Sequence, residues 1–146
     1  IGTTLEKTLN NEIALEYYTM GATTGDATSL YSLGLRYLTG NGVDADAELA
    51  ARLFVASAEK GNTDAMCKLG YMHLGGNGVA KDAFKASEWF YRAAINWNTE
   101  GMFCLAGLYL TGEGVTMDHR RGMGLLKMAA EMGNEDAINA LVSTRD

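Results

Sequence analysis

The sequence is poor in the residues from which catalytic and metal sites are usually built. Its 146 residues include no proline, two cysteines and two histidines. Cys67 and Cys104 belong to no Cys-x-x-Cys pair, and no His-Glu-x-x-His motif is present. No serine, histidine and acid share a context that marks a nucleophile. We therefore expect no enzyme activity, no cofactor and no metal site.

Long apolar runs and excess positive charge are also lacking. No stretch approaches the eighteen apolar residues that indicate a transmembrane helix, so no membrane insertion is expected. The net charge is −6, and an acidic chain repels phosphate backbones, which argues against a nucleic-acid partner. With 47% hydrophobic residues, the chain has the composition of a folded globular domain and the length to build a core.

What the sequence does contain is an internal repeat. The segment Gly40-Asn41-Gly42-Val43 recurs at Gly76 and, with glutamate in place of asparagine, at Gly112, and the offset is 36 residues both times. Residues 27–62 and 63–98 share 13 identities in 36 without a gap. A fixed interval of this length is typical of stacked repeat architectures.

Each repeat has the pattern of two helices. In the second repeat, Asn62 is placed to cap a first helix that runs to about Leu74, where Gly75 and Gly76 end it. Asp82 is placed to cap a second helix. Its apolar stripe consists of Ala86, Trp89, Phe90, Ala93 and Ala94.

The predicted fold is all-α, a single α-α superhelix, or solenoid, of 36-residue helix-turn-helix repeats with about eight helices. Its parts are a half-repeat helix at 1–24, repeats at 27–62, 63–98 and 99–134, and a capping helix at 135–146. Gly122 and Gly124 are expected to interrupt the second helix of the third repeat, because each costs about 1 kcal/mol relative to alanine.

The recurring pattern A-x-x-x-L-G-x-x-Y-x-x-G-x-G-V-x-x-D, followed by A-x-x-W/F-x-x-x-A-A-x-x-G, resembles the Sel-one-like repeat (SLR) family, a relative of tetratricopeptide repeats. Two departures stand out: Trp97 replaces the glycine found at Gly61 and Gly133, and His73 stands where the other repeats have tyrosine. The resemblance implies a non-catalytic scaffold that holds other proteins together. It also implies bacterial relatives, often exported or periplasmic, some of which neutralise secreted toxins.

The tetratricopeptide resemblance implies that the first helices line a concave, partner-binding face. The residues predicted there are Thr28, Tyr31, Leu35, Asp64, Cys67, Tyr71, Glu100, Phe103 and Asp136. Together they form an aromatic stripe, typical of binding anchors, beside an acidic one that favours a peptide carrying Lys or Arg. The structural alternative is that the tyrosines cover the groove floor and the acids stabilise helix N-termini.

Three roles are compatible with such a chain. The first is a protein-protein interaction scaffold, the second an immunity protein that neutralises a bacterial toxin, and the third a module that self-associates through its terminal helices. Because the chain begins at Ile1 rather than Met, we expect a processed or truncated product, which leaves periplasm, secretion and cytoplasm open. Cys67 and Cys104 are expected to be reduced, because helix axes lie about 8–10 Å apart and a disulfide needs Cα atoms within about 7 Å.

Overall fold

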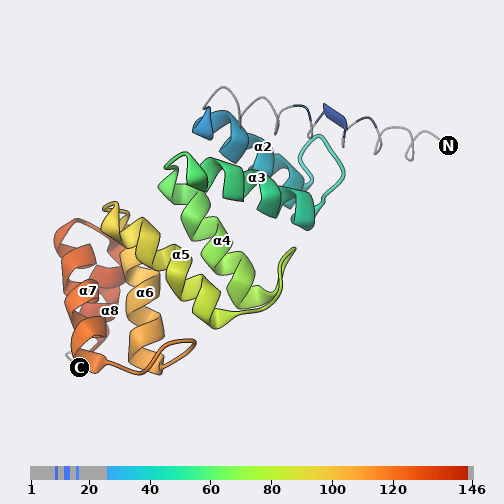
Figure 1. The fold of residues 1–146 in the computed structure, drawn as a ribbon. Coiled ribbons are helices and arrows are strands. Elements are labelled where there is room, and N and C mark those ends of the chain that lie inside the picture. Colours follow the sequence, from blue (N-terminus) through green and yellow to red (C-terminus); the bar gives the residue numbers. More distant parts are fainter. Residues whose placement is uncertain (1–8, 10–11, 14–15, 17–25, 145–146) are drawn as a thin grey trace.

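The computed structural model describes residues 9, 12–13, 16 and 26–144 (Figure 1). Seven helices follow one another in residues 26–144: α2 (Ala27–Thr39), α3 (Ala47–Glu59), α4 (Thr63–Gly75), α5 (Ala83–Ile95), α6 (Thr99–Thr111), α7 (His119–Glu131) and α8 (Glu135–Thr144). The prediction of an all-α repeat fold is confirmed. The helix predicted at 1–24 lies outside the described residues, except for four positions.

The helices begin where the sequence pattern places their caps. An aspartate or asparagine side chain accepts a hydrogen bond from the backbone N–H three residues later, as in Asn62 to Ala65 at 2.8 Å and Asp82 to Lys85 at 3.1 Å. The first helices α2, α4 and α6 all end at a glycine in the left-handed conformation. Repeated local chemistry therefore sets the repeated helix boundaries.

The helices stack as antiparallel pairs, and each second helix also packs on the first helix of the next pair (Figure 1). Large side chains of the second helices enter spaces left by small residues of the first. The fully buried ring of Phe90 lies against Gly70, where an added Cβ would sit 2.5 Å from the ring. In the third repeat the same two positions hold Ala106 and Leu126, a larger residue facing a smaller one.

The expectation that glycines interrupt α7 is wrong. The helix is continuous from His119 to Glu131. Gly122 is buried against α6, and a Cβ there would lie 2.7 Å from Cγ of Leu110. The glycine therefore allows α7 to approach α6 closely, and the packing that this approach permits offsets its weak helix propensity.

Among the described residues, no helix combines the length and the hydrophobicity that a transmembrane span requires.

Candidate interaction surface

Most of the residues predicted to bind a partner lie on one face of the first helices. Thr28, Asp64, Tyr71, Glu100 and Asp136 are exposed, and the remaining aromatic and aliphatic members are half-buried: Tyr31, Leu35 and Phe103. Cys67 is the exception, since only 1% of its surface is exposed. It lies beneath this face, and the prediction of direct contact between Cys67 and a partner must be corrected.

Tyr71 joins two neighbouring first helices at the centre of this face. Its hydroxyl donates a hydrogen bond to Oε1 of Glu100 at 2.9 Å and lies 3.0 Å from Sγ of Cys104. Its ring meets that of Phe90 edge-on, with centroids 5.3 Å apart. The ring is thus held in place from below, while 42% of the residue stays exposed. This is the geometry of a preorganised aromatic contact.

Asn98 forms a second bridge between α4 and α6. Its amide donates to Oγ1 of Thr63 at 3.1 Å and to Oδ1 of Asp64 at 3.2 Å. Its carbonyl oxygen caps α6 at Gly101 and accepts from Sγ of Cys67 at 3.4 Å. The sequence pattern predicts that Asn98 caps α6, but not that it also bonds to α4. Asparagine nevertheless recurs at this repeat position, at Asn62 and Asn134. Asn134 forms the equivalent bond to Thr99 of α6 at 3.3 Å.

The carboxylates of this face raise the pKa of two half-buried groups, Tyr31 and Cys104, and Glu100 acts on both. Burial raises the pKa of Tyr31, and the negative charges of Asp64 and Glu100 raise it further. Burial raises the pKa of the Cys104 thiol to about 11, the Tyr71 hydrogen bond lowers it, and Glu100 and Asp136 raise it. Carboxylates of α4, α6 and α8 therefore lie close enough to these two groups to raise their pKa values.

Alkylation of Cys104 tests the effect of Glu100 on the thiol pKa. The thiolate is the reactive form, so labelling is expected to be slow at pH 8 and to accelerate as the pH rises toward 11. Glu100→Gln removes a charge that raises the thiol pKa. The rate at pH 8 should then increase by up to about tenfold, because one pKa unit changes the thiolate fraction tenfold. Iodoacetamide labelling with peptide mapping separates Cys104 from Cys67, and an unchanged rate in the variant would contradict the assignment. The matched control is Glu48→Gln on α3.

Several negative findings apply to the described part of the chain. Cys67 and Cys104 are free. No group of three His, Cys, Asp or Glu side chains among the described residues is arranged to hold a metal ion. The imidazole of His73 is buried, with Nδ1 3.0 Å from the carbonyl oxygen of Ala80, which ties it to the loop after α4.

Capped helix pairs at a 36-residue interval, bridged by side chains from one pair to the next, define an α-solenoid repeat protein. The Sel1 repeat model matches residues 2–26, 27–62, 63–96 and 99–134. The chain therefore belongs to the Sel1 repeat family, as the sequence pattern predicts. Proteins of this class generally mediate protein-protein interactions and are generally non-catalytic.

Solved structures of bacterial Sel1 repeat proteins share the fold. A Sel1 repeat protein from Oxalobacter formigenes is 32% identical, with a TM-score of 0.77 over 88% of this chain and 97% of that one. A protective antigen of uropathogenic Escherichia coli with an SLR fold is 34% identical, with a TM-score of 0.79 over 87% of this chain but only 27% of its own. Cysteine rich protein B of Helicobacter pylori, 19% identical, shares the fold with a TM-score of 0.67 over 88% and 92% of the two chains. No curated protein matches the chain.

Proposed function

We propose that this chain is a non-catalytic interaction module that binds a lysine- or arginine-bearing segment of another protein on its first-helix surface. We define this surface by Tyr31, Asp64, Tyr71, Glu100, Phe103 and Asp136. The observation that carries the proposal is the pair Tyr71 and Glu100, an exposed aromatic ring fixed beside a carboxylate from the next repeat. An aromatic anchor next to fixed negative charge suits the aliphatic stem and cationic head of a basic side chain.

The spacing of the helices supports this choice of face. The first helices α4 and α6 are joined by hydrogen bonds from Tyr71 and Asn98. The second helices α5 and α7 are separated by a groove with a cavity of about 470 Å³. A stack that is tighter on one side curves toward that side, so the first-helix surface is expected to be the concave one. A concave surface held by hydrogen bonds needs little reorganisation on binding.

Charge reversal on this surface tests the proposal. A partner is first captured from the source organism with the wild-type chain as bait, then purified for binding measurements. The double variant Asp64→Lys/Glu100→Lys is expected to weaken binding at least tenfold, mainly through slower association that depends less on salt. The control Glu48→Lys/Glu113→Lys makes the same change of net charge at exposed positions on α3 and in the loop after α6.

The outcomes separate the predicted roles. Equal weakening by both double variants would show that only net charge matters and would refute the first-helix surface. A captured toxin would make the chain an immunity protein, and a component of a larger assembly would make it a scaffold. Self-association stays a prediction. The helix expected at 1–24 is largely undescribed, whereas α8 exposes Ile138 and Val142.

A further inference from the structure

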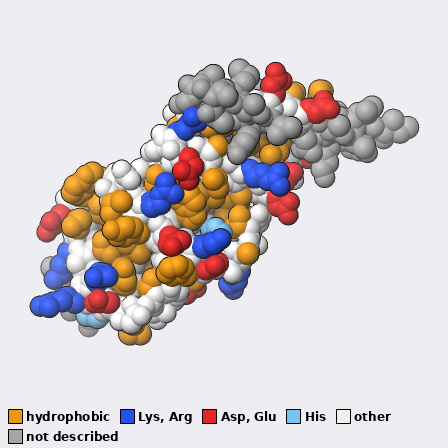
Figure 2. Space-filling model, in the orientation of Figure 1, with side chains coloured by type: hydrophobic (Ala, Val, Ile, Leu, Met, Phe, Trp, Pro, Cys, Tyr) orange, Lys and Arg blue, Asp and Glu red, His pale blue; other side chains and the backbone are white. Residues whose placement is uncertain are grey.

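A second, chemically different surface lies between the second helices α5 and α7. Two adjoining cavities of about 470 and 500 Å³ share Tyr91, Leu105 and Tyr109, so they form one continuous groove with α6 as its floor. Its exposed apolar side chains are Phe84, Tyr91, Ile95, Trp97 and Met128. Figure 2 shows hydrophobic side chains gathered over these helices. From Phe84 to Ile95 the groove follows α5 for roughly 16 Å, about three helical turns.

The equivalent groove one repeat earlier, between α3 and α5, holds a cavity of about 520 Å³, but charged side chains form part of its lining: Lys85, Glu88 and Arg92. There the guanidinium of Arg92 lies 4.7 Å over the ring of Trp89 and pairs with Glu59 at 3.6 Å. Thirty-six residues later, the positions of Trp89 and Arg92 hold Leu125 and Met128, which offer no such cover. The two repeats therefore share the opening, but Val55 is the one exposed large apolar side chain that lines the earlier groove. The run of exposed apolar side chains is specific to the α5–α7 groove.

Trp97, at one end of this groove, adopts a backbone conformation that does not favour it. Its φ is +67°, and in residues 26–144 it is the one residue other than glycine with a positive φ. The same repeat position holds Gly61 and Gly133, each with φ +97°. A large side chain is disfavoured in this region, and 68% of Trp97 is exposed, so no burial offsets the disadvantage. Strain of this kind at an exposed pocket residue indicates function.

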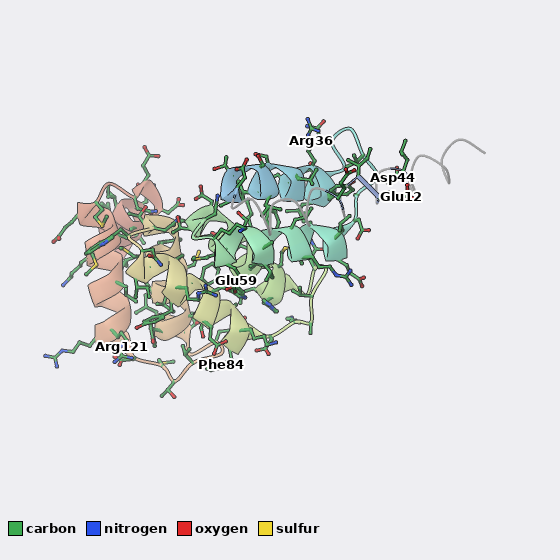
Figure 3. The ribbon with its side chains drawn as sticks, turned by 45° about the horizontal axis from the view of Figure 1, so that its top comes forward. Glu12, Arg36, Asp44, Glu59, Phe84 and Arg121 are labelled. Atoms are coloured by element: carbon green, nitrogen blue, oxygen red, sulfur yellow. The ribbon has the colours of Figure 1, made fainter. Side chains whose placement is uncertain are left out.

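The charged side chains that line the groove are Arg92 and Arg121 against Glu88, so its net charge is positive, in contrast to that of the first-helix surface. Helix α7 carries Arg120, Arg121 and Lys127 against one acid, Glu131. The guanidinium of Arg121 lies 5.4 Å from the centre of the Tyr109 ring on the groove floor, and its ion pair with Asp118 is long and exposed at 4.0 Å. Figure 3 shows Arg121 and Phe84 along the lower edge of the molecule, at the starts of α7 and α5.

We propose that the α5–α7 groove docks an amphipathic peptide helix of another protein, with its large apolar side chains on the groove floor and its Asp or Glu side chains facing Arg121. The exposed apolar lining supplies the contact area, and the positive helix α7 selects the sign of the partner. The length of the groove accommodates anchors at positions i, i+4 and i+7 of such a helix. The chain would then have two binding surfaces that select partners of opposite charge.

Selection from a phage-displayed library of random 16-residue peptides tests the proposal even while the partner is unidentified. The expected pool is enriched in acidic residues and in apolar residues at helical spacing. Binding should fall at least tenfold in Tyr91→Glu/Met128→Glu and should be retained in Val55→Glu, the matched position in the α3–α5 groove. Arg121→Glu should remove the acidic preference. All these positions are exposed, and equal unfolding midpoints confirm that the variants fold.

Three results would overturn the proposal: no enriched peptide, a pool without acidic bias, or binding that persists in the groove variant. Peptides that are basic and lost only in Asp64→Lys/Glu100→Lys would support the first-helix surface while refuting this one. If the charge-reversal experiment refutes binding at the first-helix surface, the result of the peptide selection still stands for the α5–α7 groove.

Trp97→Gly adds an independent readout. The variant has glycine at this position, as the other repeats have at Gly61 and Gly133. Its thermal unfolding midpoint should rise by a few degrees, and its affinity for the selected peptides should fall at least tenfold. A higher midpoint with unchanged affinity would remove Trp97 from the docking surface and with it the argument from its backbone conformation.

Discussion

Replacing Gly114 with alanine is expected to lower the free energy of unfolding by about 2–5 kcal/mol. The residue has a φ of +74°, which disfavours any side chain. An added Cβ would also strike the backbone of Ala83 at the start of α5 and lie 2.6 Å from its Cβ. Backbone cannot move aside as the end of a flexible side chain can. The loop after α6 would therefore be pushed away from the preceding repeat.

Gly133→Ala separates the two causes. Gly133 also has a positive φ, +97°, but an added Cβ there would meet nothing within 4 Å. Its substitution should cost only the conformational part, about 1–2 kcal/mol. Denaturant unfolding followed by circular dichroism measures both variants. Equal losses would show that the contact between Gly114 and Ala83 contributes nothing to the stability of the stack.

Truncation of Phe90 to alanine is expected to cost about 3–5 kcal/mol, the range for removing a buried ring. Phe90 is completely buried and supports both Gly70 and the ring of Tyr71. The control is Phe84→Ala on the same helix, an exposed position where the change should stay within about 0.5 kcal/mol. A small loss at Phe90 would contradict the described packing of α4 on α5.

A double substitution tests the same contact by enlarging residue 70 and making residue 90 smaller. Gly70→Ala alone should overpack the ring of Phe90 and cost about 1–3 kcal/mol. Gly70→Ala with Phe90→Leu recreates the pair Ala106 and Leu126 of the third repeat. The double variant should therefore lose less stability than the sum of the single variants. Strict additivity would show that the two positions do not share a packing space.

The parts of this structure that could be predicted from the sequence are the local ones. A cap such as Asp82 bonds three residues along the chain, so its position in the sequence is sufficient to place it. The 36-residue interval then gives the helix pairs. The continuity of α7 was not predicted, because helix propensity counts the cost of Gly122 but not the close packing against Leu110 that offsets it.

The candidate site was predicted as a set of positions, without the contacts between them. The positions of Tyr71 and Glu100 within their repeats predict that both lie on the face formed by the first helices. Their hydrogen bond, however, joins residues 29 apart and depends on the distance between α4 and α6. Cys67 has the same register, yet it is buried and bonded to Asn98, the cap of α6. The groove beside α7 was missed because it arises from differences between repeats, whereas a repeat pattern reveals only what the repeats share.

The position of the partner on the protein tests the central claim most directly. Amide hydrogen exchange, measured by mass spectrometry for the free chain and for its complex with the captured partner, resolves each helix separately. Exchange in α4 and α6, around Tyr71 and Glu100, is expected to be slower in the complex than in the free chain. A tight complex that leaves the exchange of α4 and α6 unchanged would contradict binding at the first-helix surface.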